Sequence, residues 1–196
     1  MSELDEHLKD ISEIRSMMER SSKVLSLSGL SGISAGIVAL AGVMFAHWVQ
    51  TRVAPEFVVT SLLIDALVVM VVALGLAAFF SARMAWKKGL AIWTPTSKYL
   101  LVDLAIPLGA GGVFSLALLN AHSFTLIPGT MLVFYGLALV SSSKYALKEI
   151  RFLGLTQLTL GFIALFVTQE GLNIWALGFG VMHIAYGLWM YIRYEK

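Results

Sequence analysis

The sequence predicts an all-α integral membrane protein, a bundle of six transmembrane helices with both termini in the cytoplasm. Hydrophobic residues make up 58% of the 196 residues and charged residues only 13%, against about 25% charged in an ordinary soluble domain. The charges are gathered in short clusters between long uncharged tracts. A soluble domain of this size has too little interior for so much apolar surface, so we expect the tracts to lie in the lipid bilayer. The pattern divides the chain into a cytoplasmic amphipathic helix at 1–22 and a transmembrane domain at 23–196.

The first segment, residues 2–20, has the pattern of an amphipathic helix. Ser2 and Asp5 have the spacing of a helix-start capping motif. An apolar stripe at helical spacing follows: Leu4, Leu8, Ile11, Ile14 and Met18. Six acids and three bases in this segment make anionic lipid a poor partner. Two roles stay open, packing against the protein's own cytoplasmic loops, or docking to a cytoplasmic protein partner or to a second copy. The polar, acidic start does not match a cleavable signal peptide.

Six apolar tracts follow, each long enough to cross about 30 Å at about 1.5 Å per residue. We place them near 24–49, 57–85, 99–119, 124–142, 152–168 and 172–192. Polar turns separate them at 51–56, 94–96, 120–122, 148–151 and 169–171. Pro107 and Pro128 fall within or at the start of spans, where neighbouring helices tolerate proline.

The distribution of basic residues predicts the orientation. With the N-terminus in the cytoplasm, thirteen of the fourteen Lys and Arg residues fall on the cytoplasmic side, and Arg52 alone falls outside. This is the bias that positively charged loops impose on membrane topology. The chain is therefore expected to be a multi-pass protein of the cell membrane.

Helix packing is predicted to depend on small residues, because apolar side chains gain little by leaving lipid for another helix. Ser28, Gly32 and Gly36 recur every four residues in the first helix. Gly112 and Gly161 occupy corresponding places in the third and fifth helices. We expect these residues to let the odd-numbered helices meet at the centre of the bundle.

A threefold internal repeat is also predicted. The even-numbered helices each place Met five residues before Gly and Leu directly after it, at 70–76, 131–137 and 182–188. The odd-numbered helices align as 29–40 with 154–165, and as 35–40 with 111–116. We interpret this as three parallel two-helix hairpins, which differ from the inverted repeats with broken helices found in many transporters.

This layout of three glycine-bearing hairpins resembles the small bacterial acid-resistance membrane family whose founder is HdeD. The resemblance covers the spans and rests on glycine and leucine positions; the proline pattern expected in the outer turns of that family is missing. Separately, the run from 11 to 32 resembles the opening of uncharacterised bacterial six-helix membrane proteins. These resemblances imply a bacterial inner-membrane protein and carry no activity with them.

Ionisable residues inside a membrane are costly and are treated as functional candidates. Asp65 lies about 13 Å into the second span, and His183 lies near the middle of the sixth, with Tyr186 one turn away. The neutral His183 ring is expected to bond Tyr135 or Tyr186. These four residues form the candidate polar site, although a purely structural role stays open for Asp65 and His183. For Asp103, near the cytoplasmic boundary, we expect an ion pair with Lys98 or Lys144.

A metal or haem site is the least supported possibility. His47 and His122 fall at the outer ends of odd-numbered helices, with Glu170 at the equivalent point of the fifth. Matching depth is what two haem ligands or a divalent-metal site require. However, closely spaced histidine motifs are absent, and the chain has no cysteine. We therefore predict no bound cofactor.

Motifs of soluble enzymes are missing from the sequence. It has no phosphate-binding glycine loop and no Gly-x-Ser-x-Gly elbow, and its basic clusters are topology determinants that need no nucleic acid. The leading hypothesis is a non-enzymatic scaffold, accessory or regulatory subunit with a cytoplasmic docking helix. One alternative is a small carrier or channel for protons, ions or a small solute that uses Asp65 and His183. Another is a haem- or quinone-linked redox subunit.

Overall fold

The computed structural model describes residues 28–196, so the predicted amphipathic helix at 2–20 lies outside the described residues. This part of the chain is helical throughout and contains six helices long and apolar enough to cross a membrane. The first five spans are α2 (Gly29–Arg52), α3 (Pro55–Lys87), α4 (Pro95–Asn120), η1 (Phe124–Leu126) with α5 (Ile127–Ser142) and η2 (Ser143–Tyr145), and α6 (Lys148–Phe166). The sixth span joins η3 (Thr168–Glu170), α7 (Gly171–Trp175), η4 (Ala176–Met182) and α8 (His183–Tyr194). The all-α class and the six helices of spanning length and hydropathy are confirmed.

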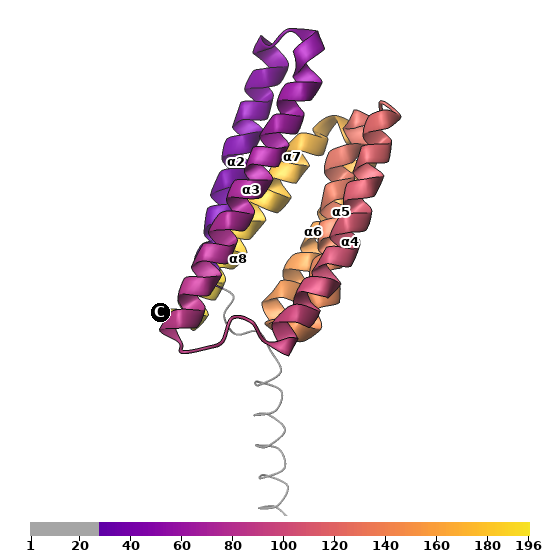
Figure 1. Ribbon diagram of the computed structural model, residues 1–196. Helices are drawn as coiled ribbons and strands as arrows, with labels where there is room; N and C mark the ends of the chain where they lie inside the picture. The colour runs from indigo at the N-terminus through magenta and orange to yellow at the C-terminus, as the bar shows by residue number, and fades with distance from the viewer. Residues whose placement is uncertain (1–27) are drawn as a thin grey trace, which may run out of the picture.

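The helices form two groups with the sixth span between them (Figure 1). In the first group α2 packs on α3, and α2 also packs on α8 and η4 of the sixth span. In the second group α5 packs between α4 and α6, and α7 reaches both α5 and α6. Helices α3 and α4 are therefore the two ends of an open path of neighbours. No residue in the most apolar stretch of α3 is buried.

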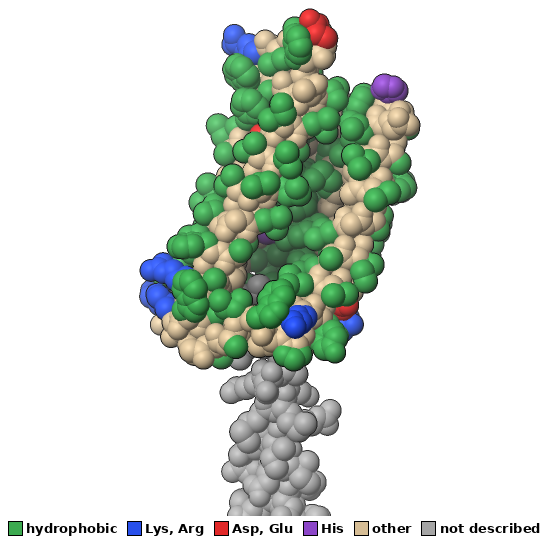
Figure 2. Space-filling view, viewed as in Figure 1, with side chains coloured by type: hydrophobic (Ala, Val, Ile, Leu, Met, Phe, Trp, Pro, Cys, Tyr) green, Lys and Arg blue, Asp and Glu red, His purple; other side chains and the backbone are tan. Residues whose placement is uncertain are grey.

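The two ends of the bundle differ in charge. One end carries the turns around Val53, Ala121 and Val167, and we call it the Val53 end. The other carries the 88–94 connection, the turn at Leu147 and the C-terminus, and we call it the Leu147 end. Among the ten Lys and Arg residues of 28–196, Arg52 alone lies at the Val53 end. Figure 2 shows basic side chains gathered near the 88–94 connection.

The C-terminus is held against the start of α2. Ser28 caps this helix by accepting a hydrogen bond from the Leu30 N–H at 3.2 Å. The Glu195 carboxylate accepts from the Gly29 N–H and from the Ser28 hydroxyl, the latter at 3.3 Å. A negative charge at the positive end of the α2 dipole is stabilising. These bonds connect the first described residues to the last ones.

The glycines of α2 face the sixth span. A Cβ built on Gly36 would lie 2.6 Å from the carbonyl oxygen of Gly180, and one built on Gly32 would lie 3.1 Å from the Gly187 Cα. The predicted meeting of the odd-numbered helices is therefore wrong, because α2 uses its small residues against an even-numbered helix.

The other two predicted packing glycines differ from each other. A Cβ on Gly161 of α6 would lie 2.7 Å from the Val133 backbone nitrogen of α5, so this glycine is also used against an even-numbered helix. A Cβ on Gly112 of α4 would meet nothing within 4 Å. Gly112 thus does not pack against another helix in this structure.

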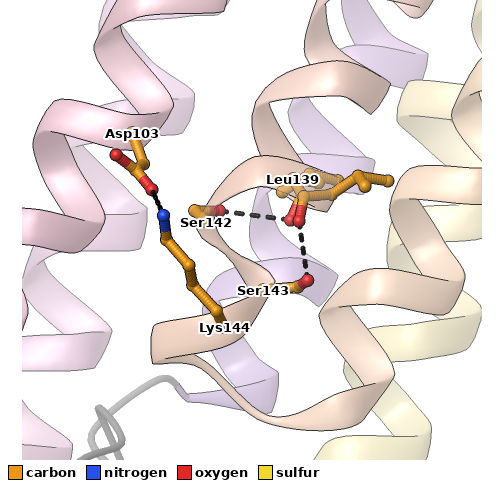
Figure 3. Close-up of polar contacts among 6 residues, drawn as sticks. Asp103, Leu139, Ser142, Ser143 and Lys144 are labelled. Carbon is orange, nitrogen blue, oxygen red and sulfur yellow. Dashed lines mark hydrogen bonds and ion pairs between the residues drawn. The ribbon is translucent and has the colours of Figure 1, made fainter.

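Figure 3 shows polar contacts where α5 ends. The Lys144 ammonium lies 2.7 Å from Asp103 of α4, which confirms the predicted ion pair and selects Lys144 as its partner. The Ser142 hydroxyl donates to the Leu139 carbonyl at 3.2 Å, so a side chain of the last turn of α5 bonds one of the backbone acceptors there.

Candidate functional site

A cavity of about 470 Å³ lies in the Val53 half of the bundle, between the two helix groups. Its walls come from the second half of α2, the first half of α3, the end of α4, η1, the start of α5, η3 and α7. Figure 2 shows the surface hollowed between α3 and the α4–α5 pair. The volume falls in the range of pockets that hold small organic molecules, about 300–1,000 Å³.

The cavity wall is largely apolar and carries a single ionisable side chain, that of Asp65. This residue is half-buried on α3. A Cβ built on Gly42 of α2 would clash with the Val69 Cγ2 and lie 3.7 Å from the Asp65 carboxylate oxygen, so both of these α3 side chains lie close to the backbone of α2. Within residues 28–196 no hydrogen bond or ion pair engages it. Placing a carboxylate in apolar surroundings without a partner is unfavourable in free energy. Asp65 is therefore the residue of the wall that most strongly indicates a functional role.

A second polar cluster surrounds His183 in the interior. His183 Nε2 lies 2.8 Å from the Tyr135 hydroxyl of α5, and Nδ1 lies 3.0 Å from the Gly178 carbonyl of η4. A carbonyl only accepts, so Nδ1 carries the proton and donates to it. Nε2 then accepts from the Tyr135 hydroxyl. Both nitrogens of His183 therefore have a hydrogen-bond partner.

Gln157 of α6 completes this cluster, and sequence reasoning missed it. Its Nε2 donates to the same Gly178 carbonyl at 2.8 Å, and the side chain is fully buried. Its Oε1 has no hydrogen-bond partner among residues 28–196. The sequence does contain a signal for it, because Gln157 is a lone amide within the apolar stretch of the fifth span. A search for ionisable residues does not select an uncharged amide.

The cluster is built on an unusual helical segment. The η4 segment has π-helical hydrogen bonding, a rare geometry that recurs at functional sites. Within it, the Phe179 ring stacks on His183 at 5.6 Å between centroids and also lies 4.8 Å from the Tyr135 ring. Trp175, which lines the cavity, packs against Phe179 with the two rings tilted by 32° and their centroids 4.7 Å apart. An aromatic column thus connects the cavity wall to the His183 cluster.

The predicted polar site of four residues is divided between two places. Asp65 belongs to the cavity wall, whereas Tyr135 and His183 belong to the interior cluster and do not line the cavity. Tyr186 is half-buried, and no hydrogen bond joins it to His183 within the described chain. The structure therefore provides one open site with a carboxylate and one buried cluster in which both nitrogens of His183 have partners.

The three residues considered as metal or haem ligands, His47, His122 and Glu170, each contact residues close to them in the sequence. His47 Nδ1 lies 2.9 Å from the Val43 carbonyl of its own helix. His122 has a positive φ of 54° in the turn after α4 and packs edge-on against Phe124. Glu170 accepts a hydrogen bond from Asn173 at 2.7 Å. Over residues 28–196, no group of three or more His, Cys, Asp or Glu residues is placed to hold a metal ion.

Comparison with protein-family models, curated proteins and solved structures finds no match to this chain.

Proposed function

We propose that this chain is a membrane protein that binds a small, largely apolar molecule bearing a cationic group, as the binding step of a carrier. The cavity between the two helix groups carries the proposal. It has the volume and the apolar wall of a small-molecule site. It also lies between spans that have the length to cross a bilayer, so an apolar ligand reaches it from the lipid.

Asp65 supports the cationic group. A carboxylate removed from water is stabilised most by an opposite charge with hydrogen-bond donors. The Asp65 carboxylate lines the cavity close to Gly42 of α2, with the Val69 side chain beside it, so an amine in the cavity would meet this carboxylate. The rest of the ligand would contact the apolar wall. The His183 ring has no part in this step, because both of its nitrogens already have partners and it does not line the cavity.

The orientation belongs to the same proposal. The excess of Lys and Arg at the Leu147 end supports a cytoplasmic position for that end and for both termini. The cavity at the Val53 end would then lie in the outer half of the membrane of a bacterial cell. The docking role predicted for residues 2–20 is independent of this function and stays a prediction.

Trp175 provides a local test. In a variant whose only tryptophan is Trp175, the four exposed residues Trp48, Trp86, Trp93 and Trp189 are replaced by Phe. The protein is placed in lipid nanodiscs and titrated with neutral 4-bromobiphenyl and with its aminomethyl derivative, whose bromine quenches nearby indole fluorescence. We expect saturable quenching by both probes and tighter binding of the amine. Asp65→Asn is expected to remove the difference between the two probes.

Two substitutions on α3 provide the controls. Ala66 lines the cavity, so Ala66→Phe fills it and is expected to abolish saturable quenching. Ala78 is exposed on the same helix outside the cavity, so Ala78→Phe is expected to leave the titration unchanged. Quenching that rises linearly with probe, and equally in both variants, would show simple partition into lipid and would refute the proposed site.

A further inference from the structure

Two helix interfaces in this structure are built alike. Between α5 and α6, Gly136 meets Gly154, and a Cβ on Gly136 would lie 2.8 Å from the Gly154 carbonyl oxygen. Between the sixth span and α2, Gly187 meets Gly29, and the corresponding distance is 2.6 Å. Gly136 and Gly187 hold the same place in the Met-x-x-x-x-Gly motif, and Gly154 and Gly29 align in the odd-numbered helices.

The α5–α6 interface and the interface of the sixth span with α2 are also alike at a second pair of positions. Seven residues before the motif glycine, Gly129 and Gly180 both lie under a leucine, at 2.9 Å from the Leu165 Cγ and 2.7 Å from the Leu40 Cγ, measured from a built Cβ. Leu165 and Leu40 also align with each other. The fourth and sixth spans thus each pack on an odd-numbered helix through two glycines seven residues apart.

The third pair of this series, α3 with α4, is open. By the same alignment, the face of α3 consists of Val68, Val72, Gly75 and Phe79, and the face of α4 consists of Ala105, Gly109, Gly112 and Leu116. All eight residues are exposed. A Cβ built on Gly75, Gly109 or Gly112 would meet nothing within 4 Å. We call these two surfaces together the α3–α4 seam.

The seam differs from the closed interfaces at two positions, and both differences weaken it. Val68 replaces the glycine that lies under a leucine in the other pairs, so its side chain would meet Leu116 when the helices approach. Gly109 stands at the position that aligns with Leu158 and Ile33. In the closed pairs these two residues contact the glycine of the Met-x-x-x-x-Gly motif. The seam therefore has a crowded point near the cavity and too little side-chain contact at Gly75. Close packing of small residues is what holds helices together in lipid.

We infer that the α3–α4 seam is a lateral gate, open to the bilayer in this structure and able to close over the cavity by the helix packing of the other two interfaces. This inference rests on the proposed function for the ligand that the gate admits. The hollow between α3 and α4–α5 gives the cavity a side opening toward lipid (Figure 2). The connection between α3 and α4 spans 88–94, whereas the closed α5–α6 pair is joined through residues 146–147 alone. The longer connection permits both positions of α3.

A disulfide between the two faces tests the closure. In the alignment, Phe79 corresponds to Val140 and Ala105 corresponds to Gly154. Val140 and Gly154 contact each other across the closed α5–α6 interface. Both positions already carry a Cβ, both are exposed, and the chain has no cysteine of its own. Phe79→Cys with Ala105→Cys, oxidised in nanodiscs, is expected to form an intramolecular disulfide at monomer mass. Val68→Gly is expected to raise the yield by removing the crowded point.

The matched control shifts one partner by a single residue. Ile106 corresponds to Leu155, which stays exposed in the closed interface, so Phe79→Cys with Ile106→Cys is expected to give little disulfide. A yield equal to this control would overturn the gate. A product of twice the monomer mass would also overturn it, because the seam would then be filled by a second copy.

The Trp175 titration separates the gate from the ligand. If the inference holds, the oxidised Phe79–Ala105 pair loses most of the saturable quenching by the amine probe, and reduction restores it. Intramolecular disulfide in a protein that shows no saturable quenching in any state would refute the proposed ligand while supporting closure. Quenching that is the same in oxidised and reduced protein would show that the seam is not the route to the cavity.

Discussion

Replacing Gly36 by Ala tests whether close backbone contact holds this bundle together. The new Cβ would lie 2.6 Å from the Gly180 carbonyl oxygen and 2.7 Å from the Ile184 Cγ1, well inside normal contact distances. The sixth span must then move away from α2, and a gap of about 0.5–1 Å loses about a quarter to a half of the dispersion energy along the contact. Overpacking of this kind costs about 1–3 kcal/mol. We expect the upper end, because a backbone carbonyl cannot rotate aside.

The net effect includes helix propensity, since Ala is favoured over Gly in a helix by about 1 kcal/mol. Gly36→Ala should therefore lower the free energy of unfolding by about 2 kcal/mol. Gly112 is its aligned counterpart in α4 and has open space around it, so Gly112→Ala should be neutral or stabilising by up to about 1 kcal/mol. The assay is reversible unfolding in mixed micelles of dodecyl maltoside and SDS, followed by circular dichroism. Equal effects of the two substitutions would refute the packing argument.

Three further predictions concern polar contacts and the N-terminal segment. Gln157→Leu should change the unfolding free energy by less than about 1 kcal/mol, because the Gly178 carbonyl keeps His183 as its donor and an unpaired acceptor is removed; a large loss in the same micelle titration would contradict this. Asp103→Asn should also cost less than about 1 kcal/mol, since the Lys144 side chain is 60% exposed; thermal unfolding in detergent measures it. Deleting residues 2–20 should reduce the recovery of a cytoplasmic partner or the mass of the oligomer in light scattering, and a change in neither would assign the segment to packing.

Much of the architecture was readable from composition and charge, because lipid imposes strong rules on a spanning chain. Length and hydropathy predicted six helices, and all six are present in the described residues. The ion pair of Asp103 was predictable as well, because a carboxylate near a boundary rich in Lys finds a partner within reach. Such inferences use one helix or one boundary at a time.

Helix neighbours were harder to predict. The spacing of Gly32 and Gly36 defines a face of α2 but not the helix that covers it, and the sixth span takes that place. The cavity could not be predicted either, because its wall combines seven segments from α2 to α7 whose neighbours the sequence does not specify. Gln157 was missed because an uncharged amide gives no topological signal. Its importance appears only when η4 brings the Gly178 carbonyl to it.

The position of Asp65 connects the ligand to the gate. It lies three residues before Val68, and residues three apart lie on one side of a helix. The carboxylate that lacks a partner and the side chain that obstructs closure therefore lie within one turn of α3. A ligand changes an equilibrium between two conformations only by its difference in affinity for them. An amine bound to Asp65 holds α3 at this level, so its binding and the approach of α3 to α4 depend on the same turn of α3.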